Sequence, residues 1–387
     1  MDIRYYFKKV DFSKIRDGIY LKDKNSLGYL IEQNSTVLNT ENIQNVRVAI
    51  IGVPFDKNSP NKGTALAPDK IRSFLYPLSN MFPELRIIDL GNLKKGRGIN
   101  DIYFAVRDVV DYLRGLNIVT VILGGGQDIG LGVAKAFNDE RYFQMSTVDP
   151  KIDLKTGREP FNSLNYISRL LKEFPDIFNI NFIGYQSYFV SRKTLSEVEK
   201  KSFQPVRLGQ VREDISALEP MLRDSHFVSF DISSVRLQDA PGFFNGSPNG
   251  FYSEEACQIS RYAGMSQNLR VFGLFEVNPK TDRDNQTLKL AAQIVWYCLE
   301  GINSCRQETQ VGNKTDFIEY NVEIEEMDSP LVFYQHTLTN RWWMRVEGLD
   351  KQKIFLACPK SDYDRAANKD IPSKWLRFIR KIDQKSK

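Results

Sequence analysis

The sequence predicts an α/β fold in which a parallel sheet is covered by helices on both faces. Apolar runs of strand length recur through the middle of the chain, and they are continuous rather than alternating, as in strands buried on both faces. Segments with helical spacing lie between several of these runs, which favours parallel strands joined by crossover helices. The length of 387 residues and the hydrophobic content of 42% allow a large core.

The expected elements follow one another along the chain in this alternating order. Helical spacing is clearest over residues 101–115, 253–264 and 286–301. In a parallel sheet of this kind, ligands bind at the carboxyl ends of the strands, so chemistry is expected there. The expected strands begin near Val48, Leu85, Ile118, Phe143, Phe178, Pro205, Phe227 and Leu269.

Three parts of the chain are expected: an N-terminal extension over 1–44, the α/β domain over 45–302 and a C-terminal extension over 303–387. Within the last, residues 331–357 favour two or three strands of a small β element. Residues 371–383 form a basic helical pattern with Trp375, Ile379 and Ile382 on one stripe. We expect this helix to dock onto the main domain; the alternative is weak contact with a partner or a membrane surface.

Charge and composition exclude several classes of protein. The net charge is +5, but residues 351–387 alone carry eleven Lys or Arg against four Asp, so the rest of the chain is about −2 and no nucleic-acid groove is expected. No apolar run reaches ~18 residues and the first residues lack a secretory signal, so we expect a soluble, cytoplasmic protein. The four cysteines form no CxxC pair, which favours buried free thiols, and two histidines exclude a site of three imidazoles.

Three polar stretches follow expected strands, at residues 123–132 (LGGGQDIGLG), 146–157 (STVDPKIDLKTG) and 229–242 (SFDISSVRLQDAPG). In this order they resemble the ureohydrolase superfamily of arginase, agmatinase and formimidoylglutamase. Residues 50–72, with a glycine-containing loop before Ala-Pro-x-x-Ile-Arg, and residues 273–284 (GLFEVNPKTDRD) are similar to flanking segments of that family. The resemblance covers about residues 45–302.

The resemblance implies a three-layer αβα arginase-like fold with an eight-stranded parallel sheet. It also implies two manganese ions bridged by hydroxide, which attacks a guanidinium or formimino carbon. The family motifs GGDHS, DAHxD and DxDxxDP supply the ligands.

The sequence departs from these motifs at several ligand positions. Gln127 stands in place of the first histidine, Lys151 in place of the second, and Ser233 in place of an aspartate. Arg236 replaces the aspartate that closes the third motif, and no histidine follows the second motif to carry protons. The chain is therefore identified as a divergent member with degraded metal motifs.

Carried over residue by residue, one metal position keeps Gln127, Asp149, Asp153 and Asp231. The vacated second position holds Lys151 and Ser233 beside the shared Asp149 and Asp231. Three carboxylates and an amide suit one hard divalent ion, Mn²⁺ or Mg²⁺, and a two-manganese cluster is not expected.

The side chain of Lys151 has two possible placements. Its ammonium fills the vacated position and holds the aspartates together, or the side chain points into solvent.

Glu276 matches the family residue that receives the guanidinium-type group of the substrate, and the alternative is a structural carboxylate bonded to a loop. Asp149, Lys151 and Glu276 are the candidate catalytic residues. Asp128 is either a further acid of the site or a helix cap.

Two functions follow from this pattern. The first is an arginase- or formimidoylglutamase-like protein that has lost two-manganese hydrolase activity and acts as a binding or scaffold module. The alternative is an active single-metal hydrolase of a C–N bond in a guanidino or formimino substrate. The expected partners are a small guanidino or formimino ligand or a protein, and the family's trimers and hexamers make a homo-oligomer an expectation as well.

Overall fold

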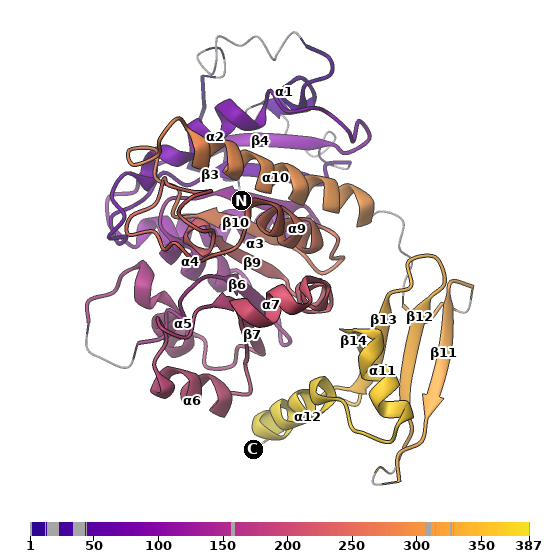
Figure 1. The fold of residues 1–387 in the computed structure, drawn as a ribbon. Coiled ribbons are helices and arrows are strands. Elements are labelled where there is room, and N and C mark those ends of the chain that lie inside the picture. Colours follow the sequence, from indigo (N-terminus) through magenta and orange to yellow (C-terminus); the bar gives the residue numbers. More distant parts are fainter. Residues whose placement is uncertain are drawn as a thin grey trace.

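A main sheet of eight parallel strands forms the centre of the molecule, in the order β4-β3-β5-β10-β9-β6-β7-β8 (Figure 1). The computed structural model describes residues 2–11, 13, 23–33, 43, 45–155, 159–305, 311–313, 315–325, 327 and 329–386. The sheet confirms the eight parallel strands expected for the α/β domain. Its strands are β3 (Val48–Gly52), β4 (Ile87–Leu93), β5 (Val119–Leu123), β6 (Gln144–Val148), β7 (Asn179–Tyr185), β8 (Gln204–Arg207), β9 (Phe227–Asp231) and β10 (Val271–Phe275).

Two short strands of the N-terminal extension join the edge of this sheet. β1 (Phe7–Lys8) pairs with β4 in the antiparallel direction and β2 (Glu32–Gln33) pairs with β4 in the parallel direction. Residues 12, 14–22, 34–42 and 44 of the extension lie outside the described part of the chain. Where the extension is described, it therefore completes the β4 edge of the main sheet.

Helices cover both faces of the sheet, which confirms the expected three-layer αβα arrangement. One face packs against α2, α7, α8, α9 and α10, and the opposite face packs against α3, α4, α5 and α6. The continuous apolar strands are explained by this double coverage, since every residue of β3, β5, β9 and β10 is buried. The helices are α1 (Leu27–Leu30), α2 (Ala67–Leu75), α3 (Asp101–Gly115), α4 (Gly130–Lys135), α5 (Tyr166–Glu173), α6 (Arg192–Lys200), α7 (Leu208–Glu213), α8 (Glu219–Arg223), α9 (Ser253–Gly264) and α10 (Gln286–Ser304).

Short 3-10 helices mark several turns between these elements, and three of them lie in the loops that carry site residues. Their bounds are Ile3–Tyr6, Thr64–Leu66, Gln127–Ile129, Ser163–Asn165, Ile215–Leu218 and Ile232–Ser234.

Helices α9 and α10 meet at two glycines. A Cβ atom on Gly264 would lie 2.2 Å from the carbonyl oxygen of Cys298, and one on Gly301 would lie 2.3 Å from the carbonyl oxygen of Arg261. Any side chain at either position would force the helices apart, so the close approach requires glycine.

An ion pair is buried between α2 and the sheet. Arg72 Nε donates to Asp89 Oδ2 at 2.8 Å, and neither side chain is exposed to solvent. The hydroxyl of Tyr76 donates to the same carboxylate. Buried charges need such partners, and this group fixes α2 against β4.

The C-terminal extension forms a separate antiparallel sheet of four strands, in the order β11-β12-β13-β14 (Figure 1). The sequence predicted two or three strands there and missed β11, in which three of six residues are exposed, Glu319 among them. Residues 306–310, 314, 326 and 328 lie outside the description. The elements are β11 (Phe317–Val322), β12 (Leu331–His336), β13 (Trp342–Glu347), β14 (Lys353–Cys358), α11 (Lys360–Ala367) and α12 (Ser373–Ser386).

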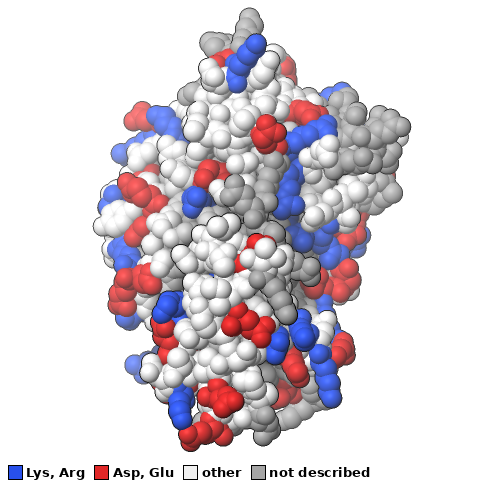
Figure 2. Space-filling model, turned by 90° about the vertical axis from the view of Figure 1, so that its right-hand side faces the viewer, with Lys and Arg blue, Asp and Glu red and all other residues white. Residues whose placement is uncertain are grey.

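Helix α12 docks onto the main domain, as expected for the basic helical pattern. Phe378 is buried against Phe178, which precedes β7, and Trp375, Ile379 and Ile382 pack in the same cluster. On the face shown in Figure 2, red side chains are scattered, and a run of blue side chains lies to the right of the centre. Among the described residues, no helix combines the length and the apolar character needed to cross a membrane.

Candidate functional site

Four adjacent strands end at the residues singled out by the sequence. β5, β10, β9 and β6 are neighbours in the sheet, and their carboxyl ends lead to Gln127, Glu276, Asp231 and Asp149. Asp153 follows β6 in the same loop as Asp149. The structure therefore brings the candidate metal ligands and the candidate substrate carboxylate to one edge of the sheet.

The three glycines after β5 allow the backbone to approach its neighbours closely. A Cβ atom on Gly125 would lie 1.9 Å from the carbonyl oxygen of Phe55, and one on Gly124 would lie 2.2 Å from the ring of Phe275. This packing directs the N–H of Gln127 to Glu276 Oε1 at 2.9 Å. The glycines therefore act as a tight turn that positions Gln127.

The carboxylate of Glu276 is held by uncharged donors. Ser59 Oγ donates to Oε2 at 2.9 Å, and Gln127 N donates to Oε1, while Asn61 Nδ2 donates to the carbonyl oxygen of Glu276 at 2.8 Å. Glu276 has a φ of +63°, a conformation that costs energy for a residue with a side chain. Burial raises the pKa of Glu276, and the hydrogen bonds from Gln127 and Ser59 oppose that rise.

The three aspartates lie out of water and close to one another. Asp149, Asp153 and Asp231 are 3%, 4% and 5% exposed. The N–H of Lys151 donates to Asp149 Oδ1 and the N–H of Ser233 donates to Asp231 Oδ1, both at 2.7 Å. These local turns aim the carboxylates at the strand ends.

Burial and mutual repulsion disfavour ionisation of this cluster. Burial, and next the charge of Asp231, raise the pKa of Asp153 to about 8. Burial and Asp153 raise the pKa of Asp149 well above its usual range, and burial, Asp149 and Glu276 do the same for the pKa of Asp231. The cluster therefore holds protons at neutral pH unless a cation binds.

The amide of Gln127 stands between two of the carboxylates. The amide atom that faces them lies 2.9 Å from Asp149 Oδ2 and 3.1 Å from Asp153 Oδ2. When this atom is nitrogen it donates to both aspartates, and the amide oxygen accepts from Ser229 Oγ at 3.3 Å. When it is oxygen, the nitrogen donates to Thr147 and Ser229, and three acceptors face one another.

The second orientation fits a divalent ion. Neighbouring oxygen ligands of an octahedral Mg²⁺ at ~2.1 Å stand about 3.0 Å apart, which is the separation of the Gln127 amide from both carboxylates. Among the described residues, no three His, Cys, Asp or Glu side chains are arranged as a metal site, so the fit depends on the amide as the third donor. Gln127, Asp149 and Asp153 can therefore hold one hard divalent ion, with Asp231 among their neighbours.

The ammonium of Lys151 does not make the expected contact with the aspartates. Its Nζ atom lies 5.6 Å from the centroid of the Phe189 ring, and within the described residues Lys151 forms no ion pair with Asp149, Asp153 or Asp231. The lysine still acts through space, because its charge lowers the pKa of Asp149 and Asp153 against the larger effect of burial. The structure thus gives no direct contact between the Lys151 ammonium and the aspartates. The placement of Lys151 at the vacated second position and its catalytic role stay predictions.

The other residue of the vacated second position is Ser233, and Arg236 stands where the resemblance places the aspartate that closes the third motif. Ser233 is buried and lies on the 3-10 turn after β9. The Arg236 guanidinium stacks 4.2 Å from the centroid of the Tyr252 ring and pairs with Asp239 at 2.9 Å. A hydroxyl and an already paired guanidinium do not replace two carboxylates, so these residues do not fit a second divalent ion.

Three polar residues of the loop after β3 contact site residues or their neighbours, although the sequence alone gave them no role. Ser59 and Asn61 hold Glu276, and Asn58 donates to the hydroxyl of Tyr103, which in turn donates to Asp128. Burial raises the pKa of Asp128 to about 7. Asp128 is therefore a buried acid beside the site rather than a helix cap. The only sequence signal for such a role was its position just after β5.

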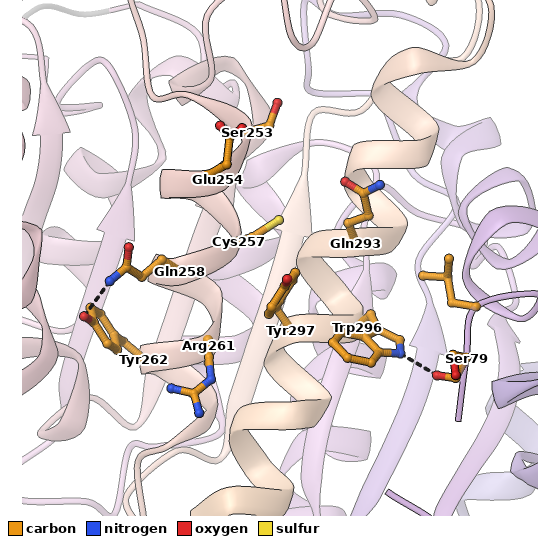
Figure 3. A pocket seen from close by; sticks show the side chains of 11 residues that line it. Ser79, Ser253, Glu254, Cys257, Gln258, Arg261, Tyr262, Gln293, Trp296 and Tyr297 are labelled. Atoms are coloured by element: carbon orange, nitrogen blue, oxygen red, sulfur yellow. Dashed lines mark hydrogen bonds between the residues drawn. The ribbon is translucent and has the colours of Figure 1, made fainter. Parts of the chain in front are cut away.

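A cavity of about 730 Å³ lies away from these residues, between α9, α10 and the segment after α2 (Figure 3). Trp296 Nε1 donates to the carbonyl oxygen of Ser79 at 2.7 Å, and Gln258 donates to the hydroxyl of Tyr262 on the other wall. None of the strand-end carboxylates lines this cavity, so it is separate from the candidate site.

The chain is similar to a known protein family over the part that carries the strand-end residues. The model of the Arginase family matches residues 46–300. The formimidoylglutamase of Lysinibacillus sphaericus (strain C3-41) is 24% identical over 276 residues, which covers 66% of this chain and 84% of the relative. The formimidoylglutamase of Streptococcus gordonii is 24% identical over 321 residues, which covers 77% of this chain and 95% of the relative.

Solved structures share the fold. A formimidoylglutamase from Bacillus subtilis superposes with a TM-score of 0.64 at 22% identity, covering 74% of this chain and 94% of that one. A formiminoglutamase from Trypanosoma cruzi, solved with Mn²⁺, superposes with a TM-score of 0.62 at 18% identity, covering 70% and 97%. At these identities the likeness concerns the fold.

Proposed function

Because the chain belongs to the Arginase family, we propose that it hydrolyses a carbon–nitrogen bond of a small guanidino or formimino compound with one divalent ion. The observation that carries this proposal is the group of four buried carboxylates at the strand ends: Asp149, Asp153, Asp231 and Glu276. Within the described residues no cation forms an ion pair with any of them. Four buried carboxylates can be ionised together only when bound cations balance their negative charge.

Charge balance supports one ion rather than two. The four carboxylates carry up to four negative charges when ionised. One divalent ion, a singly charged amidinium-type substrate and the nearby ammonium of Lys151 would together match them. A second divalent ion would leave an excess of positive charge in a buried site.

The residues of this chain would divide the work as follows. Gln127, Asp149 and Asp153 would hold the ion, which when bound lowers the pKa of water. Glu276 would receive the amidinium group, since its carboxylate is fixed by Ser59 and the N–H of Gln127 and has no cationic partner among the described residues. The water oxygen would form a bond to the amidine carbon, one proton of that water would pass to the leaving nitrogen, and the C–N bond would break to give urea or formamide and the free amine.

A second function is favoured by a specific observation. Lys151 and Ser233 stand where the resemblance places a histidine and an aspartate, and neither supplies a ligand for a second ion. On this basis the protein would bind a guanidino or formimino ligand, or a protein partner, without hydrolysing it.

One experiment separates the two functions. The purified protein, loaded with Mn²⁺ or Mg²⁺, is given arginine, agmatine or formiminoglutamate, and urea or formamide is measured. Hydrolysis that is lost in Asp149→Asn, in a variant that still folds, supports the proposal, because Asp149 is one of the residues proposed to hold the ion. The double variant Lys151→His/Ser233→Asp is tested alongside. Release of product by this variant alone would contradict the proposal and support the binding function.

A further inference from the structure

The inward face of α12 brings positive charge to the edge of the main sheet opposite to the candidate site. Lys374, Arg377 and Lys381 line a small cavity together with Asn179 and Gln204. Asn179 is the first residue of β7 and Gln204 the first of β8, so the cavity lies at the amino ends of strands whose carboxyl ends face the other way. It is therefore a different location from the strand-end carboxylates.

Lys381 is a buried cation without an acidic partner among the described residues. It is 7% exposed, its Nζ donates to Asn179 Oδ1, and it lies 5.4 Å from the centroids of the Phe178 and Phe203 rings. The charges that act on it come from Arg377, Lys374 and Lys385, all of them positive. An amide oxygen and two ring faces compensate a buried ammonium only in part.

Arg377 is the second cation available to a ligand. Within the described residues its guanidinium makes no hydrogen bond and no ion pair, and Asp362 acts on it only through space. Lys374 differs, because its Nζ pairs with Asp224 Oδ2 at 2.6 Å. Arg377 and Lys381 thus leave donors free toward the cavity, while Lys374 is already neutralised.

The shape of the space suits a small ligand with a charged end. The small cavity has a volume of about 30 Å³ and no acidic residue in its wall, which is room for one small anionic group. A cleft of about 420 Å³ shares Gln204, Lys374 and Arg377 with it. The cleft continues along apolar side chains and also carries two acids, and its wall includes Val206, Leu218, Met221, Pro359, Asp214 and Asp362.

We propose that this space is a binding site for a small anionic ligand, whose carboxylate or phosphate group enters the small cavity against Arg377 and Lys381. The planar guanidinium of Arg377 offers paired donors to such a group, and the ammonium of Lys381 adds a further charge-assisted hydrogen bond. The rest of the ligand lies in the adjoining cleft between the main domain and the C-terminal extension. Without a ligand, burial and the neighbouring cations lower the pKa of Lys381 well below its usual range.

Titration of the full-length protein with inorganic phosphate and with sodium acetate tests the site, each against sodium chloride at the same ionic strength. The readouts are the heat of binding and the melting temperature. We expect saturable binding of at least one oxyanion. Lys381→Met, which keeps the apolar stem, should weaken it about tenfold, the effect of losing one charge-assisted hydrogen bond.

A matched control lies on the same helix. Arg380 is exposed, so Arg380→Met removes one positive charge of α12 without touching the cavity and should leave the affinity unchanged. Preference for phosphate or for acetate identifies the group that the ligand carries. Absence of saturable binding of either oxyanion, or equal weakening in Arg380→Met and Lys381→Met, would overturn the proposal.

Discussion

Lys151 Nζ lies 5.6 Å from the centroid of the Phe189 ring and reaches Asp149 and Asp153 only through space. Lys151 lies in the loop after β6 and Phe189 in the loop after β7, so two neighbouring loops set the position of the ammonium. The lysine charge lowers the pKa of Asp149 and Asp153, but its ammonium forms no ion pair with either of them. The expectations below follow from a cluster of aspartates that its own lysine does not neutralise by direct contact.

We expect the protein to bind one equivalent of Mn²⁺ or Mg²⁺ and not two. The amide of Gln127 and the carboxylates of Asp149 and Asp153 provide one set of oxygen ligands, and Ser233 and Lys151 do not complete a second. Elemental analysis after dialysis and calorimetric titration measure the stoichiometry. Asp153→Asn should abolish tight binding, and Asp139→Asn, at an exposed position, should not. Two equivalents in the native chain would contradict this expectation.

Replacing Lys151 by methionine should tighten divalent-ion binding. The lysine charge repels a cation bound between Asp149 and Asp153, and two unit charges interact by ~4 kcal/mol at 4 Å and by about half of that at twice the distance, at an effective dielectric near 20. We expect the dissociation constant for Mn²⁺ to fall about tenfold in calorimetric titration. An equal or weaker affinity would mean that Lys151 contributes to the site in another way, for example by fixing the loop through Phe189.

The metal-free protein should lose stability as the pH rises from about 4 to about 8. Burial, and next Asp231, raise the pKa of Asp153 to about 8 in the folded state, whereas an unfolded aspartate has a pKa of ~3.9. Between these values the folded state binds the extra proton, so the free energy of unfolding falls by up to ~1.4 kcal/mol per pH unit from this group. Urea unfolding at a series of pH values measures the slope.

The variant Asp153→Asn isolates this contribution. Burial lowers the pKa of His226 to about 4, which gives the opposite slope between about pH 4 and 6.5, so the two effects overlap in the native chain. The difference between the native chain and Asp153→Asn removes the histidine term. A difference that does not change with pH would show that Asp153 is ionised in the folded state throughout the range.

Replacing Arg72 by methionine should destabilise the fold by ~3–5 kcal/mol, because the carboxylate of Asp89 would remain buried without its cation. Chemical denaturation measures the loss. Lys200→Met, which removes the exposed pair with Glu197, is the control and should leave the free energy of unfolding nearly unchanged, because solvent screens that pair. The double variant Arg72→Met/Asp89→Asn should recover part of the stability, and failure to do so would locate the loss in packing rather than in charge.

The sequence was informative where one physical signal dominated. Continuous apolar runs predicted the eight strands of the main sheet, and the strand-end rule placed Gln127, Asp149 and Asp231 together. Glu276 was added by the family resemblance. β1 and β2 have two residues each, too few to show any period. β11 is an edge strand in which Ile318, Glu319 and Asn321 are exposed, so its pattern resembles a loop.

The finer geometry of the site depends on contacts that spacing cannot encode. The direction of the Lys151 side chain is decided by Phe189, which is 38 residues away in the chain. The surroundings of the Gln127 amide are set by Asp149 and Asp153, which lie 22 and 26 residues further along the chain. Two donors of Glu276, Ser59 and Asn61, come from the loop after β3, more than 200 residues earlier.

The order of the central strands has a consequence for how the molecule assembles during folding. β5, β10, β9 and β6 are neighbours in space, yet Gln127 and Glu276 are separated by 149 residues along the chain. Loops of that length close late, because their entropy is lost before the strand contacts compensate for it. A manganese ion added to the refolding chain would therefore find no complete set of ligands until the central strands of the sheet had paired. Binding of the ion would mark the last stage of folding and would not start the first.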